Sequence, residues 1–175
     1  IITKLYNPQT HHLILYCDSN WNNLDDIDSY GHDIETSWLL TEAAEALGDP
    51  EVIGRCRKVA LELADASLKE GINPMGAMMY ERHKDKIRKM LLVVQAETVV
   101  GCINAWQLTG EQSYLDSAVR TWNFIKSRMI DKEYGEWFRT VLEDGTPRYK
   151  EPKASMWNCP YHNSRMGFEI DTRLK

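Results

Sequence analysis

Apolar residues recur at helical spacing through most of this 175-residue chain, and this periodicity constrains the fold more than any other feature. Between positions 50 and 70 they fall three and four apart, the pattern of a helix with one buried face. Positions 113–130 repeat the pattern, and further helices are predicted at about 33–47, at 89–108 and from Asn163 onward. Gly48, Asp49 and Pro50 are typical of one helix ending and a capped helix beginning. The prediction is an all-α chain of about five helices.

The predicted helices also repeat, at a period of 62 residues. Gly48 aligns with Gly110, and each glycine separates two helices; the same shift aligns Glu35 with Glu97. Helix–loop–helix units that repeat on this scale indicate an α/α array. In a closed α/α toroid the repeat would place Glu35 and Glu97 at matching heights near the mouth of a central funnel.

Two connections are longer than simple turns, at positions 71–88 and 134–157. The second predicts a β-hairpin in which 136–141 pairs with 148–150 across a turn at Asp144-Gly145. Long ordered loops on a helical scaffold are common places for functional sites.

Composition excludes several classes of function. The net charge is −5 and no Lys/Arg run occurs, which argues against nucleic-acid binding. No segment approaches the ~18 apolar residues that cross a bilayer. The four cysteines form no C-x-x-C pair, so no metal site is expected, and a reducing, cytoplasmic location is predicted. Six Trp and eight Tyr suit a cleft in which aromatic rings stack on sugars.

Two segments carry groups suited to acid–base chemistry. His32 and Glu35 stand three apart and share one helical face. His162 stands at the mouth of the last helix, where the helix N-terminus favours the neutral imidazole of a general base. The alternative is that each histidine is only a cap or a solvated residue. The three remaining histidines are predicted to be surface residues: His11, His12 and His83.

Other candidates have structural interpretations as well. Gln95 and Glu97 begin a very apolar helix and could serve only as caps. Three tryptophans lie on apolar stripes and are predicted to be core: Trp38, Trp106 and Trp122. Three lie in loops and are better candidates for sugar stacking: Trp21, Trp137 and Trp157.

Residues 30–40, Tyr-Gly-His-Asp-Ile-Glu-Thr-Ser-Trp-Leu-Leu, resemble the G-H-D-I-E-x-S-W-L-L segment of the N-acylglucosamine 2-epimerase family, in its cellobiose 2-epimerase branch. Gln95-Ala96-Glu97 is similar to the family's W-W-x-Q-A-E segment. Positions 135–163 resemble its final G-E-W-F…D-G…K…W-K-C-P-Y-H-N stretch. The resemblance runs in order through almost the whole chain.

The resemblance implies an (α/α)6 barrel about twice as long as this chain. The chain would be its C-terminal half, a single partial-barrel domain over residues 1–175, which agrees with a start that has neither an initiator Met nor a signal peptide.

The resemblance also implies a reaction: inversion of C2 of a reducing-end sugar through a cis-enediolate, without metal or other cofactor. His32 and His162 match the acid–base pair, with His162 the abstracting base, and Glu35 matches a carboxylate assigned to ring opening. Trp157 matches a stacking residue. The other residues expected to bind substrate are Gln95, Glu97, Trp137, Tyr161 and Asn163.

Two departures from the family leave its specificity and activity open. Leu92 and Val93 stand where the family has two tryptophans that stack on the sugar. The expected substrate is a cellobiose-type disaccharide, and N-acylglucosamine and mannose are the alternatives. The family's third His and its Arg belong to the absent half. A half barrel would expose apolar helix sides, so we expect a homodimer or pairing with an N-terminal half.

Two rivals belong to other classes. The first is a non-catalytic remnant that folds and at most binds sugar. The second is an (α/α)6 glycoside hydrolase acting through Glu35 and Glu97, ranked last because paired histidines have no role there.

Overall fold

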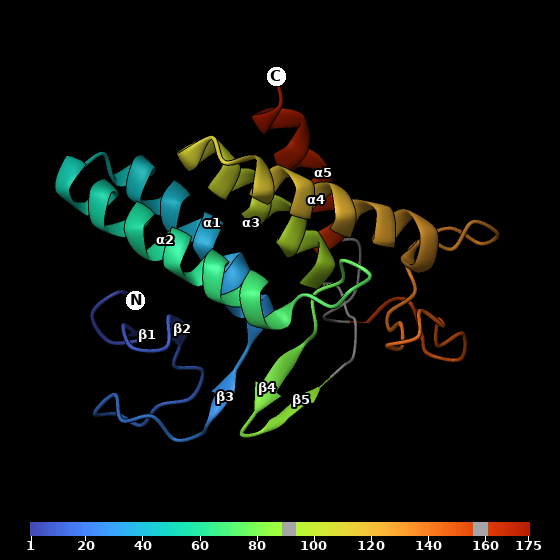
Figure 1. Cartoon of the computed structure of the whole chain (residues 1–175), viewed down its shortest axis with the longest axis horizontal. Coiled ribbons are helices and arrows are strands. Elements are labelled where there is room, and N and C mark those ends of the chain that lie inside the picture. The colour runs from blue at the N-terminus through green and yellow to red at the C-terminus, as the bar shows by residue number, and fades with distance from the viewer. Residues whose placement is uncertain (89–93, 156–160) are drawn as a thin grey trace.

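Residues 1–88, 94–155 and 161–175 are described by a computed structural model (Figure 1). The predicted all-α architecture is confirmed: within the described residues the chain forms α1 (Tyr30–Leu47), α2 (Pro50–Gly71), α3 (Val94–Thr109), α4 (Gln112–Phe124) and α5 (His162–Arg173). A π-helical turn, η1 (Ile125–Met129), continues α4. Part of the helix predicted at 89–108 lies outside the described residues.

The repeat predicted from the sequence forms two α-hairpins, α1–α2 and α3–α4. Gly48 and Gly110 end the first helix of each hairpin in the left-handed region, with φ of 77° and 74°. Each glycine amide donates to the carbonyl four residues back, that of Ala44 or Trp106. Residues with a Cβ are strained at this φ, so glycine fixes the point at which the chain reverses.

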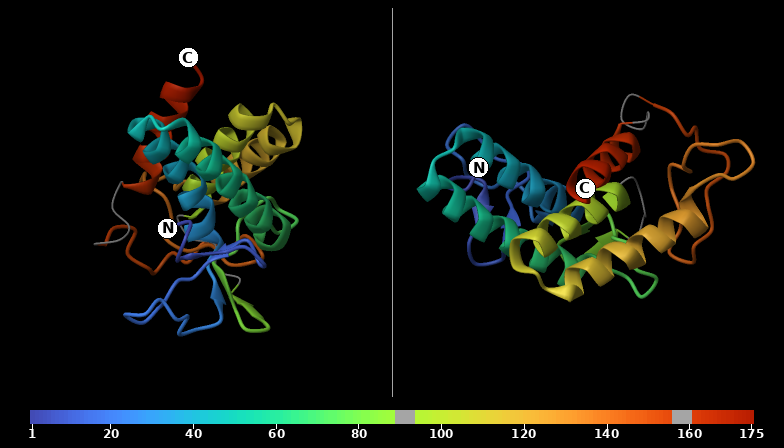
Figure 2. Two further views of the ribbon diagram at one scale, coloured as in Figure 1. Left: turned by 90° about the vertical axis from the view of Figure 1, so that its left-hand side faces the viewer. Right: turned by 90° about the horizontal axis from the view of Figure 1, so that it is seen from above.

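Helix α3 lies at the centre of the bundle, packed against α1, α2, α4 and α5 (Figure 2). Residues 94–105 are buried without interruption, as expected of an inner helix. Gly101 allows α1 to come close, since a Cβ there would lie 2.7 Å from Ile34 Cγ1. Helices α2 and α4 bury only one side and cover the outside.

Short strands complete the described fold. β1 (Tyr6–Asn7) pairs with β2 (His12–Leu13), and β3 (Ile27–Asp28), β4 (Glu81–His83) and β5 (Lys86–Arg88) form an antiparallel sheet. This sheet lies at the end of the bundle where α1 and α3 begin, because α1 follows β3 and α3 follows β5 (Figure 1).

The predicted hairpin at 136–150 is only partly correct. The turn forms, with the Leu142 amide donating to Thr146 and the Arg148 amide to Thr140, but the strand pairing is reduced to one bridge between Val141 and Pro147. A regular hairpin forms instead at β4–β5, in a charged connection whose side chains gave no alternating pattern.

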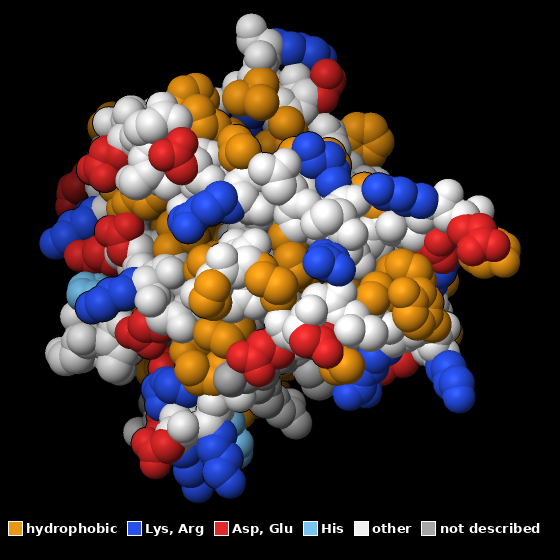
Figure 3. Space-filling view, turned by 45° about the vertical axis from the view of Figure 1, so that its right-hand side comes forward, with side chains coloured by type: hydrophobic (Ala, Val, Ile, Leu, Met, Phe, Trp, Pro, Cys, Tyr) orange, Lys and Arg blue, Asp and Glu red, His pale blue; other side chains and the backbone are white. Residues whose placement is uncertain are grey.

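The predictions for tryptophan differ in outcome. Trp38 is buried, Trp106 is partly buried, and Trp122 is 37% exposed, so its assignment to the core is wrong. Trp122 lines an apolar groove of about 290 Å³ between α3, α4 and α5. Hydrophobic side chains are exposed at several places on the face drawn in Figure 3. Exposed apolar surface therefore lies in this groove, while α3 itself is covered.

No helix in the part of the chain that the structure describes is both long and apolar enough to cross a membrane.

Candidate functional site

Glu97, in the first turn of α3, is a buried carboxylate that collects donors from two other helices. Its Oε1 accepts hydrogen bonds from His162 Nδ1 and from Arg165 Nη2, both at 2.7 Å. Its Oε2 accepts from the indole N–H of Trp38 at 3.0 Å. Both oxygens thus bond to protein groups, which places Glu97 to orient His162 and Arg165, while its direct contact with substrate stays a prediction.

The hydrogen bonds keep this carboxylate ionised. Burial would raise the pKa of Glu97, but the hydrogen bonds from His162 and Arg165, together with the positive charge of Arg165, outweigh burial and hold the pKa below its usual value.

His162 is the first residue of α5 and is partly buried. A carboxylate can only accept, so Nδ1 carries the proton in the bond to Glu97 and the lone pair of the neutral ring lies on Nε2. The ring centroid of Tyr161 lies 4.4 Å from that of His162. This arrangement fixes the ring and leaves Nε2 as the nitrogen that can take a proton.

Arg165 joins three helices at the site, and the sequence analysis missed it. Its Nη2 donates to Glu97 and also to Glu35 on α1. Its guanidinium carbon lies 5.1 Å from the ring centroid of Trp38 and 4.7 Å from that of Tyr161. The available signal was its spacing of three from His162, which puts both on one face of α5.

Glu35 and Glu97, which the repeat aligns with each other, both accept hydrogen bonds from this arginine. One oxygen of each carboxylate and one nitrogen of His162 lie within 4.8 Å of one another, a spacing that could hold a cation. Arg165 already lies against both carboxylates, so the protein itself supplies the positive charge there.

His32 lies in the first turn of α1, one helical turn from Glu35. It is exposed, and its Nδ1 lies 2.6 Å from the hydroxyl of Ser29. Both predicted acid–base histidines are therefore found in the first turns of helices, but only His162 contacts the Glu97 carboxylate.

Gln95, one of the predicted substrate contacts, lies inside the protein. It is fully buried, its amide nitrogen donates to the Met78 carbonyl at 2.6 Å, and its oxygen accepts from the Met78 amide at 2.8 Å. Gln95 therefore ties the 71–88 connection to α3, and its side chain is not exposed on the described surface.

The remaining predicted contacts lie around the start of α5. Asn163 donates to Glu136, Trp137 packs partly buried against the core, and Tyr161 is 47% exposed. Trp157 lies outside the described residues, as do Leu92 and Val93.

The surface assignment of His12 is wrong. His12 is 2% exposed, and its Nδ1 donates to Asp33 on α1 at 2.8 Å. Its partners are distant in the sequence, so local polarity gave no sign of burial. His83 is exposed as predicted, and His11 is half-buried against Tyr6.

These helices and their cluster define about half of an (α/α)6 barrel, with the polar site where its inner helices begin. The chain belongs to the N-acylglucosamine 2-epimerase (GlcNAc 2-epimerase) family, whose sequence profile matches residues 1–163.

Named relatives agree with this assignment. The chain is 41% identical to a cellobiose 2-epimerase of Ruminococcus albus, over 97% of this chain and 44% of the relative. It is 40% identical to a cellobiose 2-epimerase of Bacteroides fragilis, over 95% of this chain and 43% of the relative. A crystal structure of a sugar epimerase from a ruminal bacterium superimposes with a TM-score of 0.94 at 38% identity, covering 98% of this chain and 44% of that one. The chain thus spans less than half the length of these relatives.

Proposed function

We propose that this chain carries the acid–base half of a carbohydrate 2-epimerase, which inverts C2 of a reducing-end sugar through a cis-enediolate. The observation that carries the proposal is the Glu97–His162 pair, in which a buried carboxylate orients one ring nitrogen and leaves the other to take a proton. A C2 hydrogen beside an aldehyde is weakly acidic, and an imidazole is suited to removing it near neutral pH.

In this mechanism neutral His162 takes the C2 proton at Nε2, and the electron pair of the broken C–H bond forms the C1–C2 double bond of the enediolate. His32, in its protonated form, then returns a proton to the opposite face of C2 as the aldehyde re-forms. Glu35 assists opening of the sugar ring beforehand. Proton exchange with water restores both histidines.

The proposed substrate is a cellobiose-type disaccharide, because relatives at 40–41% identity are named for that substrate. Trp157, Trp137, Tyr161 and Asn163 are the proposed sugar contacts. N-acylglucosamine and mannose are the alternatives within the family, since Leu92 and Val93 replace two aromatic residues.

The geometry argues against a glycoside hydrolase. That chemistry needs one carboxyl group that acts as an acid. Glu97 is not suited to be that acid, because its pKa lies below the usual value. Arg165 also donates to both Glu35 and Glu97, so the two carboxylates face one guanidinium rather than opposite sides of a scissile bond. The non-catalytic remnant is the second candidate, since the chain covers 44% of its relative from Ruminococcus.

Proton NMR of cellobiose in heavy water tests the proposal. The chain is assayed alone and together with the N-terminal part of the Ruminococcus relative that it does not match. We expect loss of the C2 proton signal and growth of the C2 epimer. His162→Ala should slow exchange by about 10²- to 10⁴-fold and leave the circular dichroism spectrum unchanged. The exposed control His83→Ala should exchange the C2 proton at the wild-type rate.

Two results would contradict the proposal. Exchange at the wild-type rate in His162→Ala would remove the role of this base. A folded chain that associates with the N-terminal part, yet catalyses no exchange on cellobiose, N-acylglucosamine or mannose, would identify a remnant.

A further inference from the structure

Asp33 ties the first turn of α1 to β2. Its side chain is 1% exposed and turned away from His32 and Glu35, toward the N-terminal strands. One oxygen accepts the Nδ1–H of His12 at 2.8 Å, and the other accepts the amide of Leu13 at 2.9 Å. Both oxygens of one buried carboxylate thus connect α1 to the same strand.

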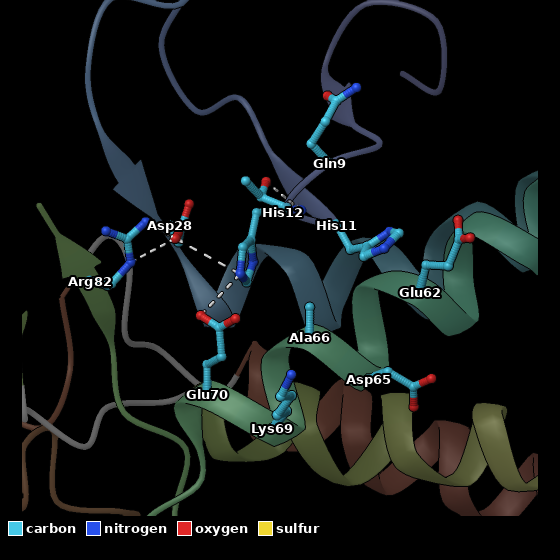
Figure 4. A pocket seen from close by; sticks show the side chains of 11 residues that line it. Gln9, His11, His12, Asp28, Glu62, Asp65, Ala66, Lys69, Glu70 and Arg82 are labelled. Carbon is cyan, nitrogen blue, oxygen red and sulfur yellow. Dashed lines mark hydrogen bonds and ion pairs between the residues drawn. The ribbon is translucent and has the colours of Figure 1, made fainter.

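The ring of His12 is held from its other side as well (Figure 4). Its Nε2 lies 3.4 Å from Glu70 Oε2 on α2 and 3.8 Å from Asp28 Oδ2 on β3. Asp28 is in turn paired with Arg82 on β4. The imidazole therefore stands where β2, β3, α1 and α2 converge, beside a cavity of about 530 Å³.

His12, Asp28 and Glu70 are close enough to hold a cation, but the contacts do not favour one. The Asp28 oxygen that faces His12 already accepts two donors from the Arg82 guanidinium. A metal ion bound to that oxygen would lie beside a fixed positive charge. The cluster is better explained as a clamp made of protein groups alone.

The first turn of α1 lacks the side-chain hydrogen bond that an N-cap residue usually provides. Ser29 occupies the N-cap position, where a serine hydroxyl normally accepts from a backbone amide of the first turn. Here it makes no such cap bond, and its Oγ lies 2.6 Å from His32 Nδ1 instead. Asp33 supplies the missing attachment, because adjacent residues point about 100° apart on a helix and Asp33 can be held while His32 stays accessible.

We propose that His12 and Asp33 are positioning residues, which fix the rotation of the first turn of α1 and so the placement of His32 and Glu35 against the substrate. The inference rests on the proposed epimerase function. Catalysis by proton transfer depends steeply on such placement, and a misplacement of about 1 Å can lower the rate about 10²-fold.

Two substitutions of His12 distinguish the bond of Nδ1 to Asp33 from the contacts of Nε2 with Glu70 and Asp28. His12→Asn keeps a donor near the position of Nδ1, and His12→Gln keeps one near the position of Nε2. In whichever preparation catalyses C2 exchange, we expect His12→Gln to lower kcat by about 10- to 100-fold with little change in KM. His12→Asn should retain most of kcat. Hydrogen exchange of the amides of residues 30–35 should accelerate in the Gln variant alone.

Equal losses in the two variants would overturn the inference, because the Nε2 contacts would then matter as much as Asp33. Wild-type kcat in His12→Gln would overturn it as well, even if the amides exchange faster. Should His12→Gln fail to fold, Asp33→Asn, which keeps the shape and removes the charge, replaces it with the same expected loss of kcat. Absence of C2 exchange in the wild-type preparation instead overturns the proposed function.

Discussion

Glu97 concentrates most of the site's interactions on one side chain, because its two oxygens accept from Trp38, His162 and Arg165. A glutamine at this position would place its NH2 group against at least one donor, the Trp38 indole N–H, and would remove the charge that pairs with Arg165. Removing one partner of a buried ion pair typically costs about 3–5 kcal/mol. We expect Glu97→Gln to lower the free energy of unfolding in urea by about that amount and to slow C2 exchange.

The matched control is Glu45→Gln, which breaks the exposed pair with Arg57. Exposed pairs contribute about 0–1 kcal/mol, so its unfolding midpoint should hardly move. Equal midpoints for the two variants would show that the Glu97 contacts do not hold the three helices together.

His12 predicts a pH dependence whose sign can be derived. Burial alone would lower the pKa of His12, but the hydrogen bond to Asp33 and the carboxylates of Asp33, Asp28 and Glu70 raise it overall. The stabilisation is therefore fully present below the unfolded pKa of about 6.5 and is lost as pH rises through the higher folded value. Urea midpoints should fall as the pH rises above about 6.5, and His12→Asn should reduce that fall. An identical slope in the variant would exclude His12 as its source.

The close packing of α1 against α3 at Gly101 can be tested by substitution. A Cβ at Gly101 would lie 2.7 Å from Ile34 Cγ1 and 2.9 Å from the Ile34 carbonyl oxygen. We expect Gly101→Ala to destabilise the chain by about 1–3 kcal/mol through overpacking. Gly54→Ala on α2 meets nothing within 4 Å and should stabilise by about 0.5–1 kcal/mol. Thermal unfolding of both variants measures these changes in stability. A higher midpoint for Gly101→Ala than for the wild type would show that α1 and α3 can move apart without losing stability.

The helices could be predicted from the sequence because their signals are local. Apolar spacing fixed their faces, while Gly48, Asp49 and Gly110 set their ends. The β4–β5 hairpin could not be predicted, because residues 81–88 are mostly charged and their pairing depends on β3, far away in the chain. The same reason explains the site: His162 and Glu35 stand in recognisable motifs, whereas the burial of His12 and the bridging by Arg165 arise only when distant elements meet.

At the scale of the whole molecule, the apolar groove between α3, α4 and α5 should make the isolated chain self-associate. Val119 and Trp122 are exposed at 50% and 37% along its α4 side. We expect sedimentation to show an oligomer, and Val119→Lys to weaken it because a charge cannot be buried there without a partner. A wild-type chain that sediments as a monomer would show that the groove stays open to water.

Arg165 and His162 bind carboxylates that precede them by 65 to 130 residues. Such pairings form only after the intervening chain has been synthesised. The contacts of Glu97 with His162 and of Glu35 with Arg165 can therefore form only once residues 162–165 have left the ribosome. A product cut short between residues 130 and 161 would retain the α1–α2 and α3–α4 hairpins but would lack both the His162 imidazole and the Arg165 guanidinium that bind Glu97.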